Sequence, residues 1–132
     1  MVKLRVRIVA GVVLLLAAGS VYLFLSRWDF WGCENELVQA VHSPDGALQA
    51  VIFQRDCGAT TGYNRQVVIL RASERFPRRV ALRSFFAPEG QPKIEAVWEG
   101  SRQLRIRYES GFNIVVKQAP EQQISATFET FR

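Results

Sequence analysis

The sequence feature that most constrains this chain is an uncharged apolar run near its start. Residues 8–25 are eighteen consecutive uncharged residues, of which Ser20 and Tyr22 are the most polar. As a helix, the run is about 27 Å long, close to the roughly 30 Å hydrocarbon core of a bilayer. Because lipid offers the backbone no hydrogen-bond partners, a segment that crosses it must be helical. The sequence therefore predicts one transmembrane helix.

The residues that flank this run predict its orientation. Three basic residues precede it: Lys3, Arg5 and Arg7. Because such residues stay on the cytoplasmic side, we expect the N-terminus in the cytoplasm and residues 28–132 outside it. Three aromatic residues follow the run, where an interfacial belt would lie: Trp28, Phe30 and Trp31. We therefore predict a retained, single-pass signal-anchor.

Three alternatives to a retained anchor remain open. A cleaved signal peptide would find small residues at 17–20, but cleavage there leaves the apolar stub 21–25 on the mature chain. A lipoprotein would use Cys33, and the bulky Trp31 fits that motif badly. A core helix of a soluble protein is the third alternative, and the basic flank and the aromatic exit argue against it.

The charge and the composition exclude several classes of function. The formal net charge is +5, and residues 1–27 carry +4 of it. The rest of the chain is almost neutral, so the high isoelectric point gives little support to nucleic-acid binding. One histidine and two cysteines supply few metal ligands and little imidazole chemistry. We expect no metal and no cofactor, and the sequence identifies no reaction.

The two cysteines, Cys33 and Cys57, both follow the apolar run. In an oxidising compartment two lone cysteines are expected to form a disulfide. The bond would close a loop of 25 residues and stabilise the domain by about 3 kcal/mol. It would also tie the membrane-proximal linker to the first hairpin. Two free thiols, or a nucleophilic Cys57 served by His42, are the alternatives.

The sequence after the linker predicts short strands separated by turns. Glu36–His42 and Leu48–Arg55 flank a turn made by Ser43-Pro44-Asp45-Gly46. In this turn proline fixes its own φ, aspartate accepts local hydrogen bonds and glycine takes a positive φ. The pattern predicts a hairpin with a four-residue connection.

The middle of the chain alternates between apolar and charged segments. Gln66–Leu70 is a continuous apolar run, which is typical of a central strand buried on both faces. A charged loop is expected at 71–79, a weaker strand at Val80–Phe86, and a turn or loop at 87–92.

A second hairpin is predicted from Ile94–Glu99 and Gln103–Tyr108, joined by three residues, 100–102. This register pairs Trp98 with Leu104 and Ala96 with Ile106 on one face. Ile94 then pairs with Tyr108, and Glu95 lies opposite Arg107 on the other face. Apolar and charged residues therefore separate onto two faces.

Two further strands, Phe112–Lys117 and Ile124–Phe131, complete a set of about seven. The fold class is therefore mainly β: one N-terminal transmembrane helix followed by a small antiparallel sheet that packs on itself as a sandwich. We divide the chain into a flank and helix at 1–27, a linker at 28–35 and an extracytoplasmic β domain at 36–132.

Two stretches carry a resemblance to known families. The Ser43–Gly46 turn with the strand after it, and the hairpin of residues 98–108, resemble hairpins of TolB-type propeller blades. The same turn, with Arg55–Gly62 (RDCGATTG) and Gln66–Leu70, resembles a family of small bacterial envelope proteins of unknown function. That resemblance covers about residues 33–110 and implies a bacterial envelope location and a shared fold with one β-rich domain. Together with the predicted orientation, it leads us to expect a bacterial inner membrane with the β domain in the periplasm. It implies no reaction.

The segment around Cys57 is the candidate ligand site. Its glycines allow the backbone to approach a ligand closely, and its hydroxyls and arginines could hold an anionic group. The candidate residues are Arg55, Asp56, Gly58, Thr60, Thr61, Gly62, Tyr63 and Arg65. The alternative is that the glycines only shape a tight connection and that the threonines satisfy its backbone.

Other chemical groups are weaker candidates. Asp56 could form a carboxylate pair with Glu34 or Glu36. A Ser-His-Asp triad of residues 42, 43 and 45 is disfavoured, because neighbours on one turn rarely reach that geometry. The densest basic stretch contains Arg71, Arg75, Arg78, Arg79 and Arg83. It is either a solvated loop or a surface for anionic lipid headgroups or envelope polymers.

The sequence favours a non-catalytic binding or structural module of the cell envelope, whose partners are the bilayer and an envelope protein or anionic component. An envelope-acting hydrolase or transferase that uses Asp56, Thr60 and Thr61 is the alternative. A third hypothesis is an accessory subunit of an inner-membrane complex. Its helix would pack through small residues: Gly11, Ala17, Ala18 and Gly19.

Overall fold

The computed structural model describes residues 1–27, 32–58, 61–77 and 80–132. The chain forms two compact units, Met1–Gly32 and Cys33–Arg132. In the first unit, helix α1 (Val2–Arg27) contains one apolar stretch, Val2–Leu25, that is long and apolar enough to cross a membrane. This matches the predicted helix, whereas the predicted aromatic belt lies outside the described residues.

Ser20, one of the two most polar residues of the apolar run, has a hydrogen-bond partner within the helix. The hydroxyl of Ser20 donates a 2.8 Å hydrogen bond to the carbonyl of Leu16, one turn earlier. A buried hydroxyl with a partner avoids most of the desolvation penalty that a free hydroxyl has in lipid. The described part of α1 carries charge only at its two ends.

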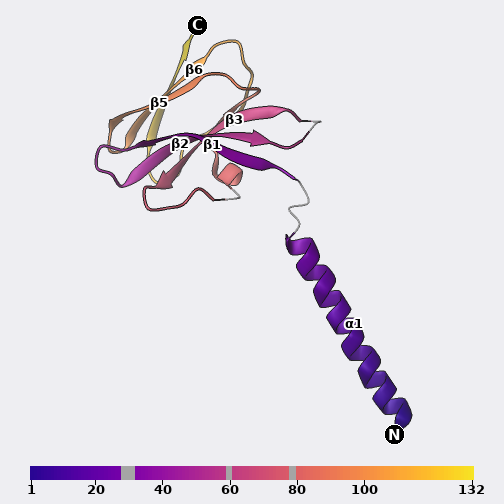
Figure 1. Cartoon of the computed structure of the whole chain (residues 1–132). Coiled ribbons are helices and arrows are strands. Elements are labelled where there is room, and N and C mark those ends of the chain that lie inside the picture. Colours follow the sequence, from indigo (N-terminus) through magenta and orange to yellow (C-terminus); the bar gives the residue numbers. More distant parts are fainter. Residues whose placement is uncertain (28–31, 59–60, 78–79) are drawn as a thin grey trace. The chain divides into compact units, whose positions relative to one another are not determined.

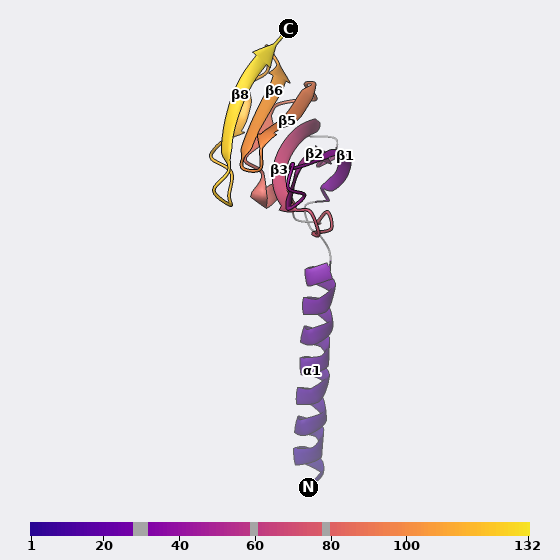
Figure 2. The same cartoon turned by 90° about the vertical axis from the view of Figure 1, so that its left-hand side faces the viewer.

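The second unit contains two sheets, which form separate layers in Figures 1 and 2. The first sheet has the order β1-β2-β3-β4-β7, with strands β1 (Glu34–His42), β2 (Leu48–Asp56), β3 (Tyr63–Arg71), β4 (Phe86–Pro88) and β7 (Ile114–Lys117). The second has the order β5-β6-β8, with strands β5 (Ile94–Gly100), β6 (Gln103–Glu109) and β8 (Ser125–Phe131). The mainly β fold class predicted from the sequence is confirmed.

One strand pair departs from the antiparallel pattern. β8 pairs with β6 in parallel, with Ile106 opposite Phe128. Parallel neighbours require a long crossover, and here the chain makes it through β7, which belongs to the other sheet. The alternation of apolar residues in β8 was visible in the sequence, but it is the same for either strand direction.

The space between the two sheets holds the main core. Ile52 and Val67 of the first sheet belong to the same buried cluster as Leu104 and Ile106 of the second. Phe86, which is fully buried, lies with its ring 4.9 Å from that of Tyr108 and 5.3 Å from that of Phe128. The burial of these side chains holds the sheets together, as expected for a sandwich.

The other face of β2 and β3 is also buried. Val51, Phe53, Val68 and Leu70 form a second cluster with Val80. The connection after β3 covers them, and its Phe76 ring lies 5.6 Å from that of Phe53. The prediction that Gln66–Leu70 is buried on both faces is confirmed.

Two predictions for the segment after this loop are wrong. Val80–Phe86 is not a strand but a single turn of 3₁₀ helix, η1 (Val80–Arg83), followed by β4. A helical turn lets Val80 pack on the sheet while the hydroxyl of Ser84 reaches the side chain of Gln66. Ala87 and Pro88, expected in a turn, instead extend β4, which is short enough to include a proline.

The first hairpin turn follows its predicted chemistry. The hydroxyl of Ser43 donates to the carboxylate of Asp45 (2.6 Å) and accepts from the amide of Leu48 (3.0 Å). The amide of Ala47 also donates to Asp45, and Gly46 has a φ of +70°. These two hydrogen bonds, that from Ser43 first, lower the pKa of the Asp45 carboxyl from its ordinary value of 3.8.

A β-bulge in β1 sets the register of this hairpin. Near the turn His42 lies opposite Gln49, but beyond the bulge between Leu37 and Gln39 the partner of Glu34 is Asp56. The first arm of the hairpin therefore contains one residue more than the second. Because the bulge accommodates this extra residue, Val38, Cys33 and Cys57 lie directly opposite each other.

The second hairpin confirms the predicted register. Trp98, Ala96 and Ile94 pair with Leu104, Ile106 and Tyr108 respectively. The connection is shorter than predicted, because Gly100 pairs with Gln103 and leaves a two-residue turn. The surplus residue is absorbed by an irregularity between Trp98 and Gly100.

We predict that Asp45→Asn destabilises the protein at neutral pH and that the difference disappears in acid. A carboxyl whose folded-state pKa is lowered stabilises the fold above its ordinary pKa of 3.8, and this contribution is lost as the pH falls through the lowered value. Urea unfolding of both proteins between pH 7 and pH 2 measures it. A difference in unfolding free energy that is constant over this range would contradict the role of Asp45.

We also predict that deletion of Val38 leaves the Cys33–Cys57 disulfide intact. Removing the extra residue makes the ladder regular and keeps the pairing of residues 34–37 unchanged. Deletion of Gln54 from the other arm is the matched control, because the first arm then has two residues more than the second instead of one. Non-reducing mass analysis should find no free thiol in the first variant and free thiols in the second.

Candidate functional site

The predicted ligand segment connects β2 to β3 at the open end of the first hairpin. Gly58 and Gly62 have φ values of +89° and +63°, as the sequence suggested. The carboxylate of Asp56 accepts from the amide of Gly58 (2.8 Å), and the carbonyl of Gly58 accepts from the amide of Thr61. These two hydrogen bonds fix the positions of Gly58 and Thr61 at either end of the connection. Thr60 lies outside the described residues.

The predicted disulfide is present beside this turn. Cys33 directly precedes β1, and Cys57 directly follows β2. The bond therefore joins the two arms of the hairpin at the end opposite the Ser43 turn. The two cysteines are 24 positions apart in the sequence, and Cys33 is the first residue of the second compact unit.

Two of the candidate residues, Asp56 and Tyr63, line a depression of about 330 Å³. Glu34 and Glu36, which the sequence analysis had only considered as partners of Asp56, lie there too. Register explains the grouping, because Glu34 is opposite Asp56 and Asp56 is opposite Tyr63. Two residues that the sequence analysis missed complete the lining: Asn35 and Gln54.

The two candidate arginines do not line this depression. Arg55 lies opposite Asn35 in the ladder and donates to Sγ of Cys57 (3.2 Å) and to the side chain of Asn35 (3.4 Å). Arg65 donates from Nη1 to the carbonyl of Pro92 (2.9 Å), and its amide donates to the carbonyl of Gly90. Arg65 thus fastens β3 to the connection before β5. Only a structure could reveal these contacts between segments distant in sequence.

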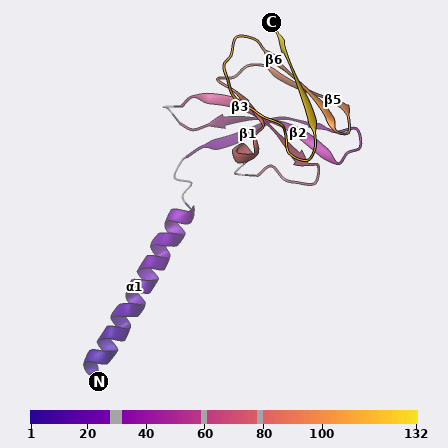
Figure 3. The same ribbon diagram turned by 180° about the vertical axis from the view of Figure 1, so that it is seen from behind.

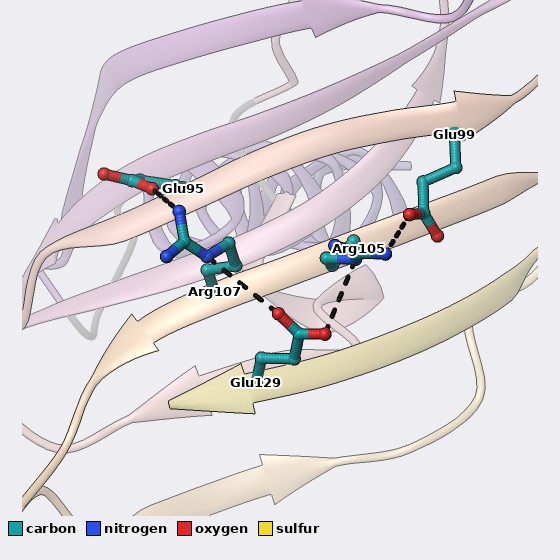
Figure 4. A network of polar contacts seen from close by, with 5 residues as sticks. All are labelled: Glu95, Glu99, Arg105, Arg107 and Glu129. Atoms are coloured by element: carbon teal, nitrogen blue, oxygen red, sulfur yellow. Dashed lines mark hydrogen bonds and ion pairs between the residues drawn. The ribbon is translucent and has the colours of Figure 1, made fainter. Parts of the chain in front are cut away.

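The outer face of the second sheet carries a network of ion pairs (Figure 4). The side chain of Arg107 lies 3.0 Å from Glu95, as predicted, and 4.0 Å from Glu129. Arg105 pairs with Glu99 and Glu129. A hydrogen bond from Lys93, with smaller contributions from the charges of Lys93 and Arg107, lowers the pKa of Glu95. The carboxylates of Glu95, Glu99 and Glu129 are thus each paired with a cation, and these side chains remain partly exposed.

The remaining chemical candidates do not form a catalytic group among the described residues. The hydroxyl of Ser43 bonds to Asp45 rather than to an imidazole, and His42 is exposed at the end of β1. Arg83 pairs with Glu74 within the basic stretch. In the ranges that the structure describes, no group of three or more His, Cys, Asp or Glu side chains is arranged to hold a metal ion.

Comparison with protein-family models, with curated proteins and with solved structures finds no match for this chain.

We predict that replacing both cysteines by serine lowers the free energy of unfolding by about 3 kcal/mol, because the loop of the unfolded chain is no longer closed. Urea unfolding of the full-length protein in detergent, with and without reductant, measures this. The reduced wild type should match the Cys33→Ser/Cys57→Ser variant. Equal stability of the reduced and oxidised wild type would contradict the prediction.

Proposed function

We propose that this protein is a single-pass, membrane-anchored module of a bacterial envelope, with its β domain on the extracytoplasmic side, where it binds another envelope component. The observation that carries the proposal is the Cys33–Cys57 disulfide, which follows the apolar helix closely in the chain. Disulfides persist in oxidising compartments. The basic residues before the helix independently favour the same orientation.

A binding role fits the way in which the candidate residues are used. Arg55 and Arg65 make contacts within the protein, whereas Tyr63 is half exposed beside a shallow, polar depression. The disulfide and the Ser43 turn fix the two ends of the hairpin that carries this surface, which lowers the entropy lost when a ligand binds. We propose that the partner contacts the loop through Asp56, Thr61 and Tyr63.

The anchor and its orientation are tested in spheroplasts of cells that express the full-length protein. External protease should remove the β domain and leave a membrane-embedded fragment that starts at Met1. Intact-mass analysis of the untreated protein should give the uncleaved chain with both thiols blocked. A mature chain shortened near residue 20, or a β domain accessible only from the cytosol, would overturn the proposal.

The binding surface is tested by a photo-crosslinking residue placed at Tyr63 in the same cells. Val97, on the outer face of the second sheet and also about half exposed, is the matched control position. We predict an adduct of defined mass from position 63, weaker in the Asp56→Asn background, and none from position 97. Equal labelling at both positions, or none at position 63, would contradict a partner at this loop.

A further inference from the structure

The distribution of charge over the β domain is uneven. Residues 71–83 carry a net charge of +4, whereas the rest of residues 28–132 carries −3. Two described residues of the connection after β3, Phe76 and Val80, pack on the cluster around Phe53 at the outer face of the first sheet. The carboxylates of the depression belong to the opposite face, because Asp56 is in line with Ile52 of the main core.

The same segment exposes an apolar side chain. Leu82 in η1 is 82% exposed, more than any other large apolar side chain among the described residues of the β domain. It is next to Arg83, and the exposed Arg75 lies on the same connection. An exposed leucine near an exposed basic side chain suits an interfacial membrane contact: Arg75 would attract lipid phosphates, and Leu82 would enter the acyl boundary.

Hydrogen bonds and an ion pair hold the described parts of this connection, residues 72–77 and 80–83. The side-chain amide of Gln49 donates to the carbonyls of Arg71 and Glu74, both at 3.1 Å. The pair between Arg83 and Glu74 joins the two ends of the connection. Leu82 therefore projects from a fixed support.

The length of the linker limits how far Cys33 can lie from the end of α1. Five residues separate Arg27, the end of α1, from Cys33, so Cys33 stays within about 20 Å of that end however extended they are. Within the β domain, η1 and the start of β1 lie at the same end, and the C-terminus lies at the other (Figures 1 and 3).

We propose that Arg75 and Leu82 form a membrane-docking surface that holds the outer face of the first sheet against anionic lipid headgroups. This inference rests on the proposed anchor and orientation. Its occupant is the bilayer in which α1 is inserted. The net negative charge of the rest of the domain favours the same orientation, because it is repelled from an anionic surface.

The test uses the full-length protein in nanodiscs of phosphatidylcholine, with or without 30% phosphatidylglycerol. Hydrogen exchange of residues 80–85 should be slower in the anionic discs, and 0.5 M salt should weaken this protection. Arg75→Glu should reduce the protection about fivefold or more, and Leu82→Asp should abolish it. The controls Arg132→Glu and Val97→Asp, which lie outside the segment, should leave it unchanged.

Three results would overturn the docking surface: equal exchange in the two kinds of disc, an equal effect of Arg132→Glu and Arg75→Glu, or protection in native membrane vesicles but not in pure lipid. The last would assign the segment to a protein partner. Failure of the protein to insert into either disc would instead overturn the anchor, so the two proposals fail separately.

Discussion

The pairing of β1 with β2 is fixed at both ends, and much of the candidate site depends on it. At one end the Ser43–Asp45 hydrogen bonds close the turn, and at the other the disulfide closes the open end. Between them the two arms differ in length by one residue, which the bulge at Val38 absorbs. The bulge reverses which side chains of β1 face the main core. Glu34 and Glu36 consequently lie beside Asp56.

Burial on two faces explains why β2 and β3 form the centre of the domain. Each strand contributes alternate residues to two separate clusters, such as Val67 to one and Val68 to the other. A strand that is buried on both faces consists of consecutive apolar residues, and this pattern is what predicted the central strand at Gln66–Leu70. By contrast, β1 is the edge strand of this sheet and is mostly exposed: its only half-buried positions are Asn35 and Val41.

The elements that the sequence predicted correctly depend on local chemistry. The Ser43 turn, the register of the second hairpin and the positive φ of Gly58 and Gly62 follow from residues that are neighbours in the chain. The errors depend on distant contacts. The segment of Val80 forms a helical turn, and Val80 packs in the cluster around Phe53. The contact of Arg65 with the carbonyl of Pro92, 27 residues away, likewise had no signal in the sequence. The parallel direction of β8 has no signal in its own alternation.

That parallel strand affects when the domain can fold. β8 is the last element of the chain, and its Phe128 completes the aromatic group around Phe86 at the centre of the sandwich. Until these final residues are available, β6 lacks a neighbour on one side and the apolar layer stays open to water. Consolidation of the core therefore requires β8, and a chain interrupted near residue 120 would expose an apolar surface that favours aggregation.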